Sequence, residues 1–257
     1  MTSISEKFKI LKKAKLVFEN WTIYPLSYYN FIRSDFIIFK TRSKKIIKLR
    51  KQSTDLMALT HVWLIEEYKK ENFEIKPNDV VIDVGAHIGL FTIYASQFCT
   101  DGKIYSFEPS TENYQLLLEN IQLNNLNCVT SFNQAVSNSN DSIDLFLNND
   151  ESGHSMFSKS SKSVKIDSIS LQKFFDENQI KRCNFLKLDC EGAEYEIIKN
   201  LPLEYFQRID KFVIEYHMAD SHPEFLIELK EILSQQNFKI ETKKLFSDIG
   251  FLYAKKI

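Results

Sequence analysis

The 257-residue sequence contains only six glycines, five prolines and four cysteines. So little glycine and proline excludes collagen-like and low-complexity chains, and a hydrophobic content of 44% argues against a disordered one. The cysteines are scattered without a C-x-x-C pair, so neither a zinc knuckle nor a disulfide scaffold is expected. This pattern favours reduced thiols in a cytoplasmic protein.

The sequence also lacks a long apolar run. No stretch approaches the ~18 residues that a membrane-spanning helix needs, and the Lys-rich N-terminus lacks the apolar core of a signal peptide. The net charge of −1 conceals an asymmetry, because residues 1–51 hold 13 Lys and Arg against three Asp and Glu. The rest of the chain is acidic, which makes its body a poor candidate for binding nucleic acid.

Strand-like and helical patterns alternate from Val80 onward. We expect strands at residues 80–84, 103–108, 129–136, 184–189 and 211–216, and helices at 90–98, 194–200 and 223–235. The runs at 238–245 and 251–255 could pair antiparallel. This alternation predicts a doubly wound, Rossmann-like α/β sheet that is mostly parallel and ends in an antiparallel strand.

The first 79 residues have a different character. We expect a β-hairpin at 35–40 and 45–50 and a helix at 55–68, together forming an N-terminal α/β cap on a domain that spans 80–257. Aromatic side chains and lysines mix in residues 1–51. Four interpretations are open: peripheral contact with an anionic membrane surface, contact with nucleic acid, a clamp for an anionic acceptor, or aromatics packed on the core beneath solvated lysines.

The turn at residues 83–89 (DVGAHIG) is the strongest candidate for ligand binding. It follows a buried strand and precedes a helix, a place where backbone N–H groups can face a ligand. Glu108 ends the next strand, 19 residues after Gly89, where a carboxylate can accept hydrogen bonds from two ribose hydroxyls. The combination predicts an adenosine-containing cofactor, and the alternative is a tight turn beside an exposed Glu.

The turn departs from the dinucleotide fingerprint G-x-G-x-x-G. His87 stands at the middle glycine, the third glycine is absent, and Asp83 places negative charge near where phosphates would lie. S-adenosylmethionine (SAM) fits better, because it has no phosphate and carries an ammonium that Asp83 can attract. A nicotinamide-dependent oxidoreductase is the less favoured alternative.

A second acidic segment follows the strand at 184–189. Asp189 and Glu191 lie there, and Glu215 and His217 end the next strand, so all four should reach the same rim of the sheet. If SAM delivers its methyl group to a hydroxyl, a proton must be removed, which makes Asp189, Glu191 and His217 the candidate catalytic residues. Helix capping is the structural alternative, and the same four side chains could hold Mg²⁺ or Mn²⁺, although their spacing does not require a metal.

Residues 148–163 form a polar stretch between strand-like pieces. They could be a lid over the acceptor, with His154 and Ser155 reaching inward, or a solvated loop.

Five segments carry a resemblance to a known family: residues 81–89 (VIDVGAHIG), 107–109 (FEP), 135–137 (AVS), 166–169 (IDSI) and 185–194 (FLKLDCEGAE). They resemble the FkbM-type SAM-dependent methyltransferases, in order, from about residue 55 to 217. The resemblance implies the class I methyltransferase fold and a SAM site that comprises Asp83, Gly85, His87, Gly89, Glu108 and Ala135.

The resemblance also implies O-methylation of a hydroxyl on a sugar, glycolipid or secondary metabolite. One departure concerns the helix at 55–68, where the family usually has Asp followed six residues later by Glu. Here Asp55 is present, but His61 takes the Glu position. A nucleic-acid methyltransferase that uses the basic arm is the alternative function, and the protein is expected in the cytoplasm or at the membrane periphery.

Overall fold

A mixed sheet of seven strands forms the centre of the protein. The computed structural model describes residues 4–146 and 163–257. The strands of the sheet are β3 (Val80–Val84), β4 (Lys103–Phe107), β5 (Val129–Phe132), β10 (Phe185–Leu188), β11 (Lys211–Tyr216), β12 (Phe238–Lys244) and β13 (Gly250–Lys256). Their order is β12-β13-β11-β10-β3-β4-β5, with β11 to β5 parallel and β13 antiparallel to both neighbours. The predicted α/β sheet with an antiparallel C-terminal strand is confirmed.

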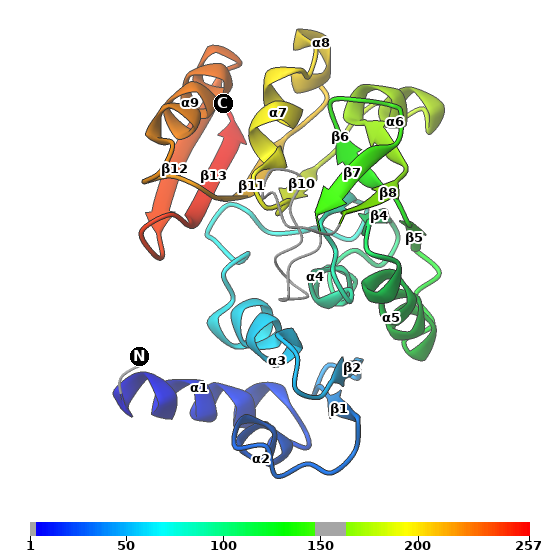
Figure 1. Ribbon diagram of the computed structural model, residues 1–257, viewed down its shortest axis with the longest axis vertical. Coiled ribbons are helices and arrows are strands. Elements are labelled where there is room, and N and C mark those ends of the chain that lie inside the picture. The colour runs from blue at the N-terminus through cyan, green and yellow to red at the C-terminus, as the bar shows by residue number, and fades with distance from the viewer. Residues whose placement is uncertain (1–3, 147–162) are drawn as a thin grey trace.

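Helices cover both faces of this sheet, as Figure 1 shows. They are α4 (Leu90–Ala95) and α5 (Thr111–Leu123) on one face, and α6 (Leu171–Glu177), α7 (Ala193–Lys199), α8 (Leu203–Phe206) and α9 (Pro223–Gln235) on the other. Side chains alternate between the faces along each strand. Val81 and Phe185 therefore join the core under α4, whereas Ile82 and Leu186 join the core under α7.

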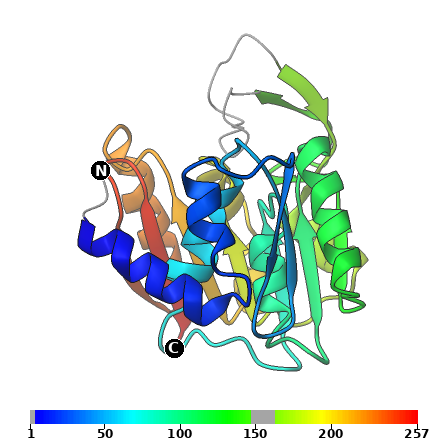
Figure 2. The ribbon, with the colours of Figure 1, turned by 90° about the horizontal axis from the view of Figure 1, so that it is seen from below.

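The N-terminal residues form a further layer outside α4 and α5. This layer contains α1 (Ile4–Val17), α2 (Ile23–Tyr28), β1 (Phe36–Lys40), β2 (Ile46–Arg50), α3 (Asp55–Leu59) and the π-helix η1 (Thr60–Ile65). The view from below in Figure 2 shows α1, α2 and the antiparallel β1–β2 hairpin on the outside of the molecule. The predicted hairpin is confirmed, and Asn120 of α5 fastens it by bonding both backbone groups of Lys48.

Two expectations about local structure are wrong. The strand expected at 129–136 is divided: Asn133 turns away to bond the carbonyls of Glu108 and Pro109, and β6 (Ala135–Ser137) leaves the sheet to pair with β9 (Ser168–Ser170). The helix expected at 55–68 is α-helical only to Leu59, continues as η1 and ends at Glu66 in a left-handed conformation.

The remaining pair, β7 (Ile143–Phe146) with β8 (Ser163–Ile166), flanks the polar stretch. The lid expected there, with His154 and Ser155, lies outside the described residues. None of the described helices has the length and hydropathy that crossing a bilayer requires.

Candidate active site

A cavity of about 460 Å³ lies at the carboxyl ends of β3, β4, β10 and β11. Ligands of open α/β sheets bind at this edge, because loops of neighbouring strands diverge there. The cavity lining includes Gly85, His87, Glu108, Ala135, Asp189, Glu191 and His217, so seven of the nine sequence-predicted site residues meet in one place. Asp83 and Gly89 are not part of its lining.

The glycines of the first turn are required by the protein's own backbone. Gly85 has a φ of +76°, and a side chain there would overlap the backbone carbonyl of Asp189. Gly89 has a φ of +88°, and a side chain there would press on the end of Leu117. The sequence interpretation attributed both glycines to the close approach of a ligand, whereas the structure shows a turn packed against β10 and α5.

Glu108 joins the two turns that border the cavity. Its carboxylate accepts hydrogen bonds from the backbone N–H groups of His87, at 2.8 Å, and Ser110, at 2.9 Å. Burial outweighs these bonds and raises the pKa of Glu108 to about 7. The carboxyl group therefore titrates near neutrality while it faces the cavity beside Pro109 and Ala135.

Asp83 supports the cavity from beneath. Its side chain is fully buried, and it accepts hydrogen bonds from Lys187 Nζ, at 2.9 Å, and Thr92 Oγ1, at 2.7 Å. Lys187 also donates to the carbonyl oxygen of Gly85, at 2.8 Å. Asp83 was expected to attract the ammonium of SAM, but in this structure it binds the ammonium of Lys187. Lys187 in turn links the glycine turn to β10.

Asp189, Tyr68 and Glu215 form a hydrogen-bonded group on one wall of the cavity. The Tyr68 hydroxyl lies 3.1 Å from Asp189 Oδ2 and 3.3 Å from Glu215 Oε2. Burial, and next the Asp189 carboxylate, hold the pKa of Glu215 well above its usual range. Burial therefore favours the protonated form of Glu215, and Lys187 Nζ lies 3.5 Å from Asp189 Oδ2 on the same wall.

His217 lies between two glutamates. Its Nδ1 is 3.0 Å from Glu194 Oε1, and its Nε2 is 3.6 Å from Glu191 Oε2. Burial opposes the charged ring, but Glu194 and Glu191 outweigh it and raise the pKa of His217 to about 10. At neutral pH His217 is an imidazolium, which argues against the general-base role expected for it.

A second histidine–glutamate pair lies on the cavity wall that η1 provides. His61 Nδ1 is 2.8 Å from Glu67 Oε2, and both residues line the cavity. A carboxylate only accepts hydrogen bonds, so Nδ1 is the donor, and in the neutral ring this tautomer leaves the lone pair on Nε2. Among the described residues no hydrogen-bond partner of Nε2 is found.

The hairpin contacts the first turn through Arg50. The Arg50 guanidinium donates to Asp55 at 2.8 Å, contacts Asn113 at 2.9 Å, and lies 3.3 Å from His87 Nε2. Burial lowers the pKa of His87 to about 4, so its ring is neutral. Asp55, the acidic residue of the family pattern, therefore positions Arg50 and the turn and does not face the cavity.

A metal was the open alternative for the acidic rim. Ligand atoms of Asp189, Glu215 and His217 lie within 4.8 Å of one another. An imidazolium has no lone pair for a metal, however, and Nδ1 of His217 is engaged with Glu194. These residues fit a metal poorly as they stand.

Three features of the site have no simple sequence signal. Tyr68 and Glu67 reach the cavity because the π-helix and the left-handed Glu66 shift the chain after Leu59. His61 was noticed only as a departure from the family pattern. Lys187 and Glu194, by contrast, belong to the FLKLDCEGAE segment and could have been assigned a supporting role from it.

Comparisons with known proteins place the chain among methyltransferases. A family model described as "Methyltransferase FkbM domain" matches residues 83–240. "Methyltransferase 1" of Beauveria bassiana is 26% identical over 210 residues, which are 70% of this chain and 83% of that protein. "Hexuronic acid methyltransferase AglP" of Haloferax volcanii is 23% identical over 208 residues, 78% of this chain and 83% of that protein.

Solved structures support the fold. A methyltransferase FkbM from Methylobacillus flagellatus superposes with a TM-score of 0.51 at 17% identity, over 77% of this chain and 53% of that one. The Methanococcus jannaschii fibrillarin pre-rRNA processing protein superposes with a TM-score of 0.51 at 15% identity, over 86% of this chain and 83% of that one. The expected class I methyltransferase fold is confirmed. Because the family model matches more than half of this chain, the chain belongs to the FkbM methyltransferase family.

Proposed function

We propose that the protein transfers a methyl group from SAM to a hydroxyl oxygen of a sugar or another polyhydroxylated acceptor. The observation that carries this proposal is one cavity with two different sides. Glu108 follows β4 and Ala135 begins β6, whereas Asp189 follows β10, which lies on the other side of β3 from β4, and His61 and Glu67 come from η1 and the turn after it. Family membership removes the nicotinamide-dependent oxidoreductase from consideration.

The cofactor half of the cavity suits an adenosine. Glu108 offers carboxylate oxygens for the ribose hydroxyls, and Ala135 and Val136 offer a small apolar wall for a flat base. Asp189 supplies negative charge where a cationic ligand would be stabilised. When bound, SAM supplies an electrophilic methyl group, and the described side chains bind and orient its ends.

Proton removal from the acceptor is the second task of the site. His217 holds a proton at neutral pH, so it is not suited to accept another. We assign this task to Nε2 of His61, because Glu67 fixes the ring and leaves that nitrogen directed at no other described side chain. Asp189 and Glu191 then serve to orient the cationic reactant and to balance the charge of the site.

The charge of the cavity disfavours a polyanionic acceptor. Glu67, Asp189 and Glu191 line it, the cation of Lys187 is paired with Asp83, and the cation of His217 is paired with Glu194. Such a wall repels a polyanion, which disfavours the nucleic-acid methyltransferase alternative. The relative AglP, a hexuronic acid methyltransferase, supports a sugar as the acceptor class.

Calorimetric titration with SAM tests the cofactor site. Glu108→Gln should weaken SAM binding by roughly 1.5–3 kcal/mol at slightly alkaline pH, the range for a lost charge-assisted hydrogen bond. Because the pKa of Glu108 is raised to about 7, SAM affinity of the wild-type protein should rise as the pH passes through neutrality, and that of the variant should stay constant.

Glu204→Gln, an exposed carboxylate on α8, is the matched control and should bind SAM like the wild type. Unchanged SAM affinity of a folded Glu108→Gln protein would disprove the assignment of this site.

A further inference from the structure

We propose that the outer face of the N-terminal layer is a docking surface for an anionic lipid bilayer. This outer surface consists of two parts: the outward stripe of α1, which comprises Phe8, Lys9, Lys12, Lys15 and Leu16, and an aromatic tip of Tyr28, Tyr29 and Phe31. The proposal is independent of the catalytic assignment, because none of these residues lines the cavity.

Exposed apolar side chains concentrate in this layer. Seven of the sixteen large apolar side chains that are exposed in the described chain lie between residues 8 and 36. Phe8 is 69% exposed, Leu16 65% and Phe31 71%. Single exposed apolar residues are ordinary, but a cluster of them marks an interaction surface.

Helical spacing places apolar and basic side chains together on the outward stripe of α1. Positions 8, 9, 12, 15 and 16 recur at intervals of three and four and are all exposed, whereas Ala14, between them in sequence, is buried. The stripe therefore presents two large apolar groups among three lysines, and it contains no acidic residue. Lysine stems can lie along an apolar boundary with their ammonium groups in the headgroup layer.

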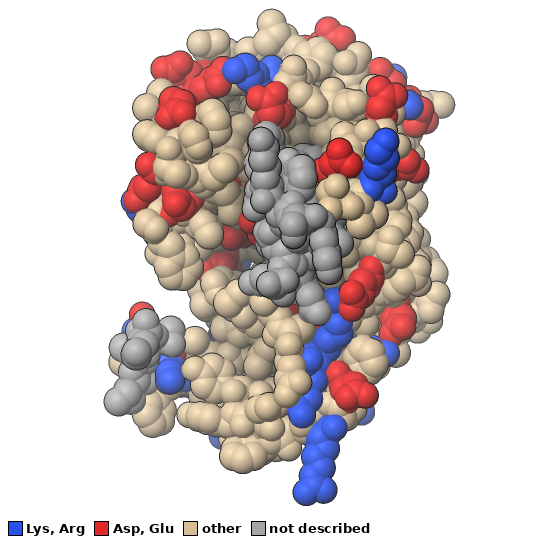
Figure 3. Space-filling view, in the orientation of Figure 1, with Lys and Arg blue, Asp and Glu red and all other residues tan. Residues whose placement is uncertain are grey.

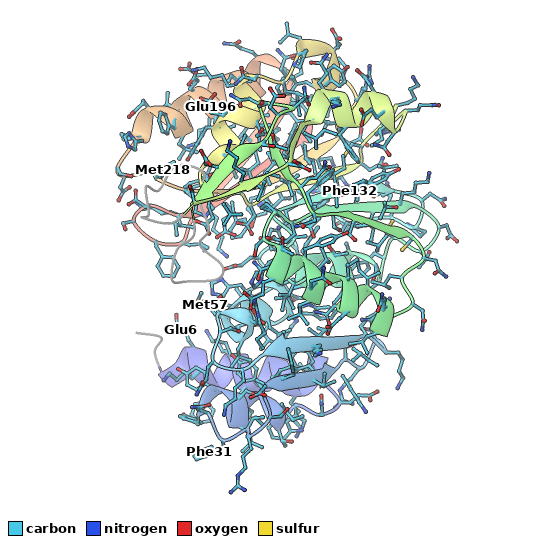
Figure 4. The ribbon with its side chains drawn as sticks, turned by 45° about the vertical axis from the view of Figure 1, so that its right-hand side comes forward. Glu6, Phe31, Met57, Phe132, Glu196 and Met218 are labelled. Atoms are coloured by element: carbon cyan, nitrogen blue, oxygen red, sulfur yellow. The ribbon has the colours of Figure 1, made fainter. Side chains whose placement is uncertain are left out.

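The aromatic tip is a joined cluster. Ring centroids of Tyr28 and Tyr29 are 5.2 Å apart, those of Tyr29 and Phe31 are 6.5 Å apart, and Lys7 Nζ lies 5.3 Å from the Tyr28 ring. The last contact links the tip to α1. Figure 4 shows Phe31 at the lower end of the molecule, well away from Met57 on the cavity rim. Contact at the tip therefore leaves the cavity rim uncovered.

The charge of the layer matches an anionic partner. In the view of Figure 3 the upper half of the molecule shows mainly acidic side chains, and a row of basic ones runs past the β1–β2 hairpin to the lower end. Within the part of the chain that the structure describes, no ion pair engages Lys7, Lys9 or Lys12. Lysines without an acidic partner are attracted to anionic headgroups.

The combination favours a bilayer over a nucleic acid. Basic side chains alone would bind an anionic bilayer or a nucleic acid equally well. Exposed Phe and Leu side chains add favourable binding free energy only where they are transferred out of water, as in a bilayer. Tyr and Phe beside Lys are typical of helices that lie in the interface of a membrane.

The experiment is co-sedimentation of the full-length protein with vesicles of phosphatidylcholine, with and without phosphatidylglycerol. The wild type should bind the anionic vesicles, with an affinity that falls as salt rises, and should not bind the neutral ones. Tyr29→Ser with Phe31→Ser should weaken binding roughly 10- to 100-fold. Lys9→Glu with Lys12→Glu should weaken it roughly tenfold or more.

Two control double variants make the same kinds of substitution at exposed positions outside the N-terminal layer. Leu203→Ser with Ile227→Ser removes exposed apolar groups, and Lys181→Glu with Lys239→Glu reverses exposed charges. Both should bind vesicles like the wild type, and all variants should keep the wild-type circular dichroism and unfolding midpoint.

Absence of binding to anionic vesicles at low salt would overturn the proposal, as would equal losses in the control pairs. Binding to heparin that is unaffected by Tyr29→Ser with Phe31→Ser, without vesicle binding, would show a plain polyanion site instead.

Discussion

At the scale of the residue, the two histidine–glutamate pairs of the cavity have opposite roles. His217 is enclosed by Glu194 and Glu191, so it keeps its proton, whereas His61 has one carboxylate partner and a second nitrogen without a described partner. Identical side chains thus differ because of their surroundings. Each role leads to a separate measurement.

The pH dependence of folding tests the charge of His217. Its pKa is raised from 6.5 to about 10 in the folded state, so the protein gains stability that is fully present below pH 6.5 and lost as the pH rises through 10. The unfolding free energy of the wild type should fall across this range by a few kcal/mol relative to that of His217→Gln. Denaturant titrations at a series of pH values measure these unfolding free energies. If the free energies of the two proteins change with pH in parallel, His217 is not charged in the folded state.

The rate of methyl transfer tests the general-base role of His61. His61→Gln should leave SAM affinity nearly unchanged and lower methyl transfer by the ~10²–10⁴-fold typical of a lost general base. Labelled SAM with a glycan extract provides the assay, and Glu67→Gln should share the defect because the ring loses its fixed orientation.

His222→Gln is the matched control, since His222 also pairs with a glutamate, Glu224, but lies outside the cavity. Normal turnover by His61→Gln would move the base role to Asp189 or Glu191.

At the scale of the element, the carboxyl ends of β3 and β10 are packed backbone to backbone. The side chain that Gly85→Ala adds would overlap the Asp189 carbonyl, which cannot move without distorting β10. Gly89→Ala meets only the flexible end of Leu117. Both positions have a positive φ, which costs an L-residue about 1–2 kcal/mol.

Gly85→Ala should therefore lower the unfolding free energy by more than Gly89→Ala does. Urea unfolding of the two variants gives the comparison directly. Equal losses would mean that the backbone contact is unimportant and that only φ matters.

At the scale of the whole molecule, the N-terminal layer completes the core on one face of the sheet. Phe18, Phe39, Ile47 and Leu49 are fully buried and belong to the same cluster as Phe185 of β10. The hairpin also bonds to α5 through Asn120. Without this layer the outer sides of α4 and α5 would be exposed to water.

Deletion of residues 1–51 should thus give an aggregated or unfolded chain, because several large apolar side chains lose their partners at once. Soluble yield, circular dichroism and thermal unfolding measure this, and Leu16→Ser, which changes an exposed side chain of the same layer, should behave like the wild type. A shortened chain with native circular dichroism would contradict this expectation. The predicted boundary at residues 79 and 80 stays a prediction.

Local sequence determined most of the elements. Strand β11 and helix α9 lie where they were expected, because an apolar run between turns and a helix opened by Pro223 are local signals. The turn at 83–89, Glu108 and the FLKLDCEGAE segment were likewise visible, and the parallel strands bring them together at one edge of the sheet.

Tertiary structure decided the rest, because it depends on neighbours that are distant in sequence. The pairing of His217 with Glu194 makes it a cation, and the burial of Asp83 against Lys187 removes it from the cavity. The π-helix that brings His61 and Glu67 to the cavity wall has no local signature and is held by packing against α1 and α4. The sequence shows which site residues are present and in which order. Their protonation states and the directions of their side chains depend on burial and on which charged groups the fold brings together.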